Sequence, residues 1–460
     1  MTGAHELNPT VLREYDIRGV VGLTLSAVDA KAIGCAFGTI IAHGGGKTIC
    51  VGYDGRASSP EFEAALVAGL KSAGVDVLRV GLGPTPMLYY AVHSLGADGG
   101  IMVTGSHNPP DNNGFKFMLE KIPFFGKSIQ QLGALVAAGD YLSGLGSARE
   151  VPVLKHYVER VALEAADLKP LKVVWDAGNG AAGEAMEMLT ARLPGEHILL
   201  NETIDGTFPA HHPDPTVPEN LVQLIDKVRA ENCDLGIAFD GDGDRIGIVD
   251  NDGKILWGDQ ILALLARPVL RGQPGATIIA DVKASQVLFD EVARLGGTPL
   301  MWMTGHSLIK SKMLETGAPL AGEMSGHIFF ADRYYGFDDA LYAAIRILSV
   351  ICSEAQSLAS LRASLPQRIN TPELRFTCDD GRKFGAIEEV RQRLNAAGAD
   401  VGAIDGVRVN TEDGWWLLRA SNTQPVLVAR CEAKNQDGLE RLKQALVGQL
   451  NESGIEPPEF

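Results

Sequence analysis

The chain has 460 residues, more than one hydrophobic core of about 250–300 residues can organise, so three or four domains are expected. Its 41 Lys and Arg against 57 Asp and Glu give a formal net charge of −16, which argues against a nucleic-acid or anionic-membrane partner. The N-terminal residues lack the apolar run of a signal peptide, no stretch reaches the ~18 apolar residues of a membrane span, and the 6 cysteines are scattered without metal-ligand spacing. A cytoplasmic protein is predicted.

The first predicted domain, residues 1–151, opens a threefold repeat of strand, helix, strand and polar loop. Apolar and amphipathic runs predict, in chain order, a strand, a helix and two further strands: residues 48–53, 60–73, 75–80 and 100–103. The last strand continues into TGSHNP, where a sharp turn presents the hydroxyl of Ser106. By itself this loop fits a Ser/Asn turn that caps its own backbone as well as it fits a nucleophile.

The second predicted domain, residues 152–254, repeats this order of elements. Its predicted strands are residues 172–175, 197–200 and 235–239. The loop that follows, DGDGDR, places Asp240, Asp242 and Asp244 at alternate positions, where three carboxylates can converge on a hard cation, with Mg²⁺ favoured. A calcium-binding EF-hand is excluded because Arg and Asn stand where that loop requires Gly and Glu. A solvated Asp/Gly turn is the simpler alternative.

The third predicted domain, residues 255–367, contains a strand at 277–280, a helix at 285–294 and a strand at 299–303. It then reaches GEMSGH, which combines the acceptor Glu323, the hydroxyl of Ser325 and the imidazole of His327. Such a set suits a polyol ligand, although a lone Glu or His is often only a solvated or structurally paired residue.

The remaining residues, 368–460, form a different pattern and predict a separate α+β domain. Short alternating segments predict strands at residues 373–377, 406–410, 415–419 and 426–431, followed by a C-terminal helix. The turn RASNTQP, which begins at Arg419, offers a guanidinium and several neutral donors suited to phosphate oxygens. An ordinary hairpin connection is the alternative.

Strands that alternate with helices predict α/β domains with largely parallel sheets, whose ligands gather beyond the carboxyl ends of the strands. The three polar loops occupy the same position in their repeats. We therefore expect them to face one cleft.

Six motifs in this order closely resemble the bacterial phosphomannomutase/phosphoglucomutase branch of the α-D-phosphohexomutases. They are YDIRG from Tyr15, TGSHNP, GFK ending at Lys116, DGDGDR, GEMSGH and RASNTQP. The resemblance covers nearly the whole chain. It implies four domains around a central cleft, three related mixed-sheet α/β domains followed by a smaller α+β domain. Gln424 departs from the family, where Glu is frequent at this position.

The resemblance also implies roles for individual residues. Ser106 matches the phosphorylated serine and, with Asp240, Asp242 and Asp244, the ligands of Mg²⁺; Arg18, His107 and Lys116 match residues around the phosphoserine. Arg245, Lys283, Gly305 and His306 match positions that line the sugar cleft, Glu323 and Ser325 those that bind ring hydroxyls, and His327 one close to the reacting oxygen. Tyr15, Arg419, Ser421, Asn422 and Thr423 match a distant phosphate site.

These residues predict an intramolecular phosphotransferase that interconverts hexose 1-phosphate and hexose 6-phosphate of mannose or glucose through a hexose 1,6-bisphosphate. Lys116, His306 and His327 are the candidates for proton transfer. Two alternatives are a serine-dependent metallophosphatase, which would release phosphate to water, and a non-catalytic phosphosugar sensor. The motifs leave the choice between mannose and glucose, and the oligomeric state, open.

Overall fold

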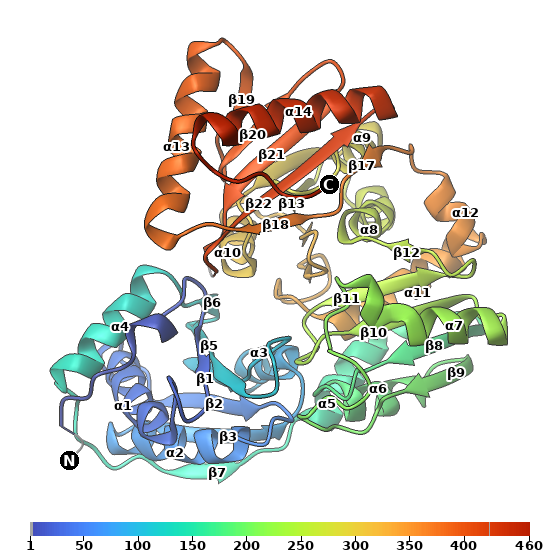
Figure 1. Ribbon diagram of the computed structural model, residues 1–460. Coiled ribbons are helices and arrows are strands. Elements are labelled where there is room, and N and C mark those ends of the chain that lie inside the picture. The colour runs from blue at the N-terminus through green and yellow to red at the C-terminus, as the bar shows by residue number, and fades with distance from the viewer. Residues whose placement is uncertain (1–2, 423) are drawn as a thin grey trace.

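The structure is a computed structural model that describes residues 3–422 and 424–460. Four units follow one another along the chain and are arranged around the centre of the molecule (Figure 1). The first lies at the lower left of the view, the second at the lower right and the fourth at the top, with much of the third behind it. The predicted class, three related mixed-sheet α/β units followed by an α+β unit, is confirmed.

The first unit is built on a seven-stranded sheet with the order β1-β5-β4-β2-β3-β7, to which β6 adds beside β5. The strands are β1 (Ile17–Val20), β2 (Thr48–Tyr53), β3 (Asp76–Leu82), β4 (Gly99–Val103), β5 (Asn112–Leu119), β6 (Ile122–Pro123) and β7 (Ala148–Glu150). The helices are α1 (Ala27–His43), α2 (Ser59–Ser72), α3 (Thr85–Leu95) and α4 (Lys127–Ala138). Helix α1 begins with a capping box, because Ser26 and Asp29 bond to each other's backbone N–H.

The second unit has a five-stranded sheet with the order β12-β11-β10-β8-β9. The strands are β8 (Leu171–Asp176), β9 (Gly195–Leu200), β10 (Leu235–Phe239), β11 (Ile246–Asp250) and β12 (Ile255–Leu256), and the helices are α5 (Leu154–Ala162), α6 (Gly183–Thr190) and α7 (Val222–Glu231). Strand β10 is buried along its whole length, as its unbroken apolar sequence predicts for a central strand.

The third unit has a four-stranded sheet with the order β14-β13-β15-β16. The strands are β13 (Thr277–Asp281), β14 (Thr298–Trp302), β15 (Leu320–Gly322) and β16 (Ile328–Phe330). The helices are α8 (Gly258–Gly272), α9 (Gln286–Arg294), α10 (His306–Thr316), α11 (Ala340–Glu354) and α12 (Leu358–Ala363).

The fourth unit is an antiparallel sheet with the order β17-β22-β21-β20-β19, in which β18 also pairs with β22. The strands are β17 (Ile369–Asn370), β18 (Leu374–Thr377), β19 (Asp400–Gly402), β20 (Val407–Asn410), β21 (Gly414–Ala420) and β22 (Val426–Ala433). The predicted C-terminal helix is α14 (Gln436–Glu452), but α13 (Asp380–Ala396) was not predicted.

The first three units share one topological core. In each, a central strand pairs in parallel with two neighbours, giving β3-β2-β4, β9-β8-β10 and β14-β13-β15. The third strand then pairs antiparallel with the next strand of the sheet, β5, β11 or β16. The TGSHNP, DGDGDR and GEMSGH loops all follow that third strand. The predicted threefold repeat is therefore present, with the polar loops at equivalent sheet edges.

Apolar packing joins these three units. One buried cluster includes residues from all of them, such as Met87, Trp175 and Leu341. Aromatic rings continue it at the surface, where the rings of His93 on α3 and Tyr335 meet at a tilt of 37° with centroids 4.9 Å apart. Among the described residues, no helix is long and apolar enough to cross a membrane.

Candidate active site

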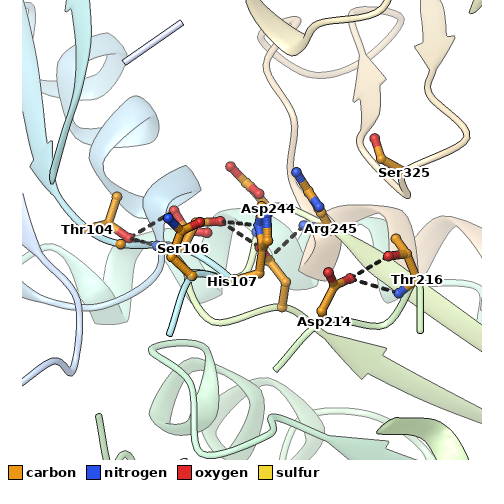
Figure 2. Close-up of polar contacts among 12 residues, drawn as sticks. Thr104, Ser106, His107, Asp214, Thr216, Asp244, Arg245 and Ser325 are labelled. Carbon is orange, nitrogen blue, oxygen red and sulfur yellow. Dashed lines mark hydrogen bonds and ion pairs between the residues drawn. The ribbon is translucent and has the colours of Figure 1, made fainter. Parts of the chain in front are cut away.

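The serine loop, residues 104–109, follows strand β4 and carries Ser106. Ser106 has a φ of 50°, a left-handed conformation that costs a residue with a side chain. Its side chain is 2% exposed, and its Oγ donates to Asp240 Oδ2 at 2.9 Å and lies 3.1 Å from His107 Nδ1. The hydroxyl of Thr104 accepts from the Ser106 amide at 2.8 Å. Figure 2 shows Ser106 and His107 beside Asp244 and Arg245.

The three aspartates of the DGDGDR loop are completely buried. One carboxylate oxygen from each lies within 4.8 Å of the other two. Within the described part of the chain, Asp242 Oδ1 and Asp244 Oδ1 have no hydrogen-bond partner. Buried, converging and incompletely bonded carboxylate oxygens fit a Mg²⁺ ion, which prefers hard oxygen ligands. The Ser106 hydroxyl adjoins this set through Asp240.

Lys116, on β5, contacts two of these carboxylates. Its Nζ donates to Asp242 Oδ2 at 2.7 Å and to Asp244 Oδ2 at 2.5 Å. Burial alone would lower the pKa of Lys116, but Asp242 and Asp244 outweigh it and hold the pKa well above its usual value. Lys116 is therefore a cation in this structure and balances part of the aspartate charge.

Two cationic or titratable side chains flank the serine loop. Arg18, on β1, donates to the Gly105 carbonyl at 3.0 Å, to Asn108 Oδ1 at 2.8 Å and to Asp16 Oδ2 at 2.5 Å. Burial, followed by the charges of Arg245 and Arg18, lowers the pKa of His107 well below its usual value. His107 is thus neutral near pH 7, while Arg18 supplies positive charge beside Ser106.

The rings of His327 and His306, both in the third unit, stack on each other with centroids 5.4 Å apart. Arg245 Nε donates to His327 Nε2 at 2.9 Å. Because a guanidinium only donates, Nε2 must accept, and the proton of His327 sits on Nδ1. That nitrogen lies 3.0 Å from Asp338 Oδ2. Burial and then Lys310 lower the pKa of His306 well below its usual value.

The other predicted sugar-contacting residues also belong to the third unit. Glu323 Oε1 accepts from the Gly305 amide at 2.5 Å, and Ser325 Oγ donates to Glu323 Oε2 at 3.4 Å. Gly305 has a φ of 139°, and a Cβ there would lie 2.5 Å from the ring of Tyr15, so both backbone and space require glycine. Lys283 Nζ donates to Glu373 Oε2 at 2.9 Å, which joins the third unit to the fourth.

The predicted phosphate site involves three units. The hydroxyl of Tyr15 donates to the Thr304 carbonyl at 2.9 Å and accepts from Asn422 Nδ2 at 2.8 Å. Arg419 Nε donates to Asp405 Oδ2 at 2.9 Å. The hydroxyl of Ser421 accepts from the Gln424 amide at 3.2 Å, and Gln424 Oε1 accepts from Arg375 at 3.0 Å. Thr423, predicted for this site, lies outside the described residues.

Several residues in or behind the site were not predicted from the sequence. Thr85 donates to Asp242 Oδ2 at 2.5 Å, Asp405 accepts from both Arg419 and the Thr304 amide, and Asp338 faces both histidines. A signal existed for Asp338: the sequence places two aspartates before an apolar helix, although one suffices as its N-cap. No such signal marks Thr85 or Asp405.

Comparison with known proteins agrees with the fold and with the order of its four units. Profiles of phosphoglucomutase/phosphomannomutase match residues 9–142 as alpha/beta/alpha domain I, 154–253 as domain II, 257–369 as domain III and 373–449 as the C-terminal domain. A phosphomannomutase/phosphoglucomutase of Pseudomonas aeruginosa is 46% identical over 447 residues, which cover 97% of this chain and 96% of that protein.

Two further relatives extend the comparison. A phosphoglucomutase of Neisseria gonorrhoeae is 42% identical over 437 residues, 94% of this chain and 95% of its own. The crystal structure of a phosphoglucomutase/phosphomannomutase family protein from Burkholderia thailandensis has a TM-score of 0.93 at 45% identity, covering 99% of this chain and 100% of that one. The chain therefore belongs to the phosphoglucomutase/phosphomannomutase family and is an enzyme, as the sequence predicted.

Proposed function

We propose that the chain is a cytoplasmic hexose phosphate mutase that interconverts the 1-phosphate and 6-phosphate of mannose, glucose or both through phospho-Ser106. The observation that carries the proposal is the contact of the Ser106 hydroxyl with Asp240 inside a buried group of three aspartates. The names of the relatives, which include phosphomannomutase and phosphoglucomutase, support the same reaction class.

In the proposed first step, a sugar hydroxyl attacks the phosphorus of phospho-Ser106. A new P–O bond to the sugar forms as the bond to Ser106 Oγ breaks. The sugar hydroxyl loses its proton and the serine oxygen takes one up, so a hexose 1,6-bisphosphate and the free Ser106 hydroxyl result. The bisphosphate then reorients, and its other phosphoryl group returns to Ser106. Charge spreads over three phosphoryl oxygens in such a transfer, so positioning and electrostatics carry most of the catalysis.

Asp240, Asp242 and Asp244, with an oxygen of phospho-Ser106, would hold Mg²⁺, as their burial and convergence allow. When bound, Mg²⁺ supplies positive charge that lets a phosphosugar approach a phosphoserine of about −1.5 to −2 charge. Arg18 and Lys116 add protein cations at the same point. We propose that they hold the phosphoserine in line with the incoming hydroxyl.

His327 is our proposed acceptor of the hydroxyl proton. In its Nδ1–H form it presents Nε2 as a lone-pair acceptor, which Arg245 now occupies. A bound phosphosugar would draw Arg245 toward its own oxygens and free Nε2. Asp338 would stabilise the imidazolium that forms, because its carboxylate faces Nδ1 at 3.0 Å.

The remaining predicted residues are proposed to bind the substrate. Glu323 and Ser325 would bind ring hydroxyls, with Lys283, Gly305 and His306 beside them. Tyr15, Arg419, Ser421, Asn422 and Thr423 would hold the phosphate that does not react. Arg419 is 6% exposed and already paired with Asp405, so this guanidinium is oriented before substrate arrives.

A coupled assay with Mg²⁺ and catalytic glucose 1,6-bisphosphate tests the proposal on glucose 1-phosphate and mannose 1-phosphate separately. Formation of a 6-phosphate from at least one sugar is expected, with one phosphoryl group on Ser106 by mass spectrometry of the intact protein. Release of stoichiometric free phosphate instead would favour a phosphatase. Sugar binding without turnover, unchanged in Ser106→Ala, would favour a sensor.

A further inference from the structure

A buried arginine stands behind the serine loop, outside the residues assigned to the reaction above. Arg56 follows β2, and its side chain is 1% exposed. Its Nη2 donates to the carbonyls of Ser106 at 2.7 Å and Asn108 at 2.6 Å, and its Nη1 to those of Pro109 at 2.5 Å and Asn112 at 2.9 Å. We propose that Arg56 is a positioning residue that fixes the backbone of this loop, and through it Ser106 Oγ, for phosphoryl transfer.

Asp54 bonds both to Arg56 and to the serine loop. One carboxylate oxygen accepts from the Arg56 amide at 3.1 Å and from Ser59 Oγ at 2.5 Å. The other accepts from the Gly105 amide at 3.1 Å and lies 3.3 Å from Arg56 Nε. The carboxylate of Asp54 therefore balances the charge of the Arg56 guanidinium and holds it in one orientation. The same carboxylate also bonds to Gly105, at the start of the serine loop.

The conformation of the serine loop explains why it needs the hydrogen bonds from Arg56 and Asp54. Ser106 holds a positive φ, a strained conformation for a residue with a side chain, which persists only when the surroundings impose it. Arg56 draws the Ser106 carbonyl to one side, and the trans peptide then turns the amide of His107 to the opposite side. The backbone of Gly105 packs closely against the Arg56 guanidinium, because a Cβ at this position would lie 2.4 Å from Arg56 Cζ.

The second unit closes the far side of this arrangement. The ring of Phe208 lies 5.2 Å from Arg56 Cζ, and a Cβ on Gly206 would be 2.5 Å from the Arg56 Cα. Gly241, within the aspartate loop, packs on the very carbonyl that Arg56 holds, because its Cβ would lie 2.3 Å from the Ser106 oxygen. Arg56 thus fixes the serine loop against the loop that carries the three aspartates.

Lysine cannot replace this contact set. A guanidinium offers five N–H donors in a planar fork, whereas an ammonium offers three donors around one atom. Arg56→Lys keeps the charge beside Asp54 and gives up the simultaneous hold on four carbonyls. A residue that served only to neutralise Asp54 would tolerate this change.

The test measures single-turnover transfer from phosphorylated Ser106 to glucose 1-phosphate together with steady-state kcat and KM, and it rests on the proposed mutase reaction. Arg56→Lys should slow transfer on the order of 100-fold, as expected for a reacting group displaced by about 1 Å, while KM stays within about twofold. The matched control is Arg79→Lys, which removes a fork bonded to Glu63 at 2.7 and 2.8 Å in the same unit. It should transfer at the wild-type rate.

Transfer by Arg56→Lys at the wild-type rate, or a loss that matches only its unfolded fraction, would overturn the inference. A rise in KM with unchanged kcat would do so as well. If Arg56→Lys does not fold, Gly105→Ala decides, because it pushes the guanidinium from the other side and should slow transfer with little change in KM. Absence of mutase activity in the wild type would instead refute the proposed function.

Discussion

At the scale of single residues, Asp338 shows how a side chain acts through another. It is completely buried, lies 3.0 Å from His327 Nδ1 and accepts from Lys310 Nζ at 2.9 Å. Burial would raise the pKa of its carboxyl, but Lys310 and the two histidines reverse this and hold the pKa well below the usual value. An ionised carboxylate therefore favours the His327 tautomer with its proton on Nδ1, which leaves Nε2 as the acceptor that the proposed reaction requires.

Asp338→Asn should lower kcat by about 10²- to 10⁴-fold, the usual contribution of an oriented acid–base group, while leaving KM nearly unchanged. Asparagine retains an oxygen for Lys310 but no longer favours the Nδ1–H tautomer of His327. Steady-state kinetics of the purified variant measures the effect. A kcat within twofold of wild type would show that His327 does not depend on this carboxylate.

At the scale of elements, the neighbouring Asp339 has a different task. It is the N-cap of α11 and accepts from the Tyr342 amide at 2.9 Å. It also accepts from the hydroxyls of Tyr157, on α5, at 2.9 Å and Tyr334 at 2.8 Å. The carboxylate of Asp339 thus joins the start of α11, in the third unit, to α5, in the second unit.

Asp339→Ala should lower the free energy of unfolding by about 2–4 kcal/mol, because a cap is lost and two buried hydroxyls lose their acceptor. Urea denaturation followed by circular dichroism measures the change. Each variant is the control for the other. Asp338→Asn should affect turnover far more than stability, whereas Asp339→Ala should affect stability far more than turnover. Equal effects of both would contradict this division.

Much of the fold was predictable because its central strands are apolar and end in polar loops. The predicted residues 48–53 and 235–239 coincide with β2 and β10, and the three loops lie at equivalent sheet edges. Helix α13 was missed because its sequence is strongly polar and its apolar stripe of Ala386, Val390 and Leu394 is narrow. Arg56 was not among the predicted site residues, since its partners are backbone carbonyls that no sequence pattern displays.

At the scale of the whole molecule, the junction of the first three units contains a titratable ring. Burial, aided by Lys121, lowers the pKa of His93 to about 4. The unfolded chain, with a histidine pKa near 6.5, therefore binds more protons between pH 6.5 and 4, and stability rises with pH across this window. Acid should loosen the contact of His93 with Tyr335 and Phe337.

His93→Phe should reduce the loss of stability on acidification, because phenylalanine keeps the ring contact and cannot be protonated. Thermal unfolding midpoints of both proteins are measured from pH 7 to pH 4. The difference between variant and wild type should grow in favour of the variant as pH falls. Parallel curves would show that His93 does not contribute.

Among the residues that the structure describes, the hydroxyl of Tyr15 links three units with two hydrogen bonds. At about 1 kcal/mol each, these bonds make a weak latch that thermal motion can open during a catalytic cycle. Opening before the second transfer would let the bisphosphate escape and leave Ser106 without its phosphoryl group. Tyr15→Phe should therefore raise the dependence of turnover on added glucose 1,6-bisphosphate by up to about tenfold, measured as the activator concentration for half-maximal rate. In the proposed reaction, the strength of this latch would set how many cycles the enzyme completes before Ser106 has to be phosphorylated again.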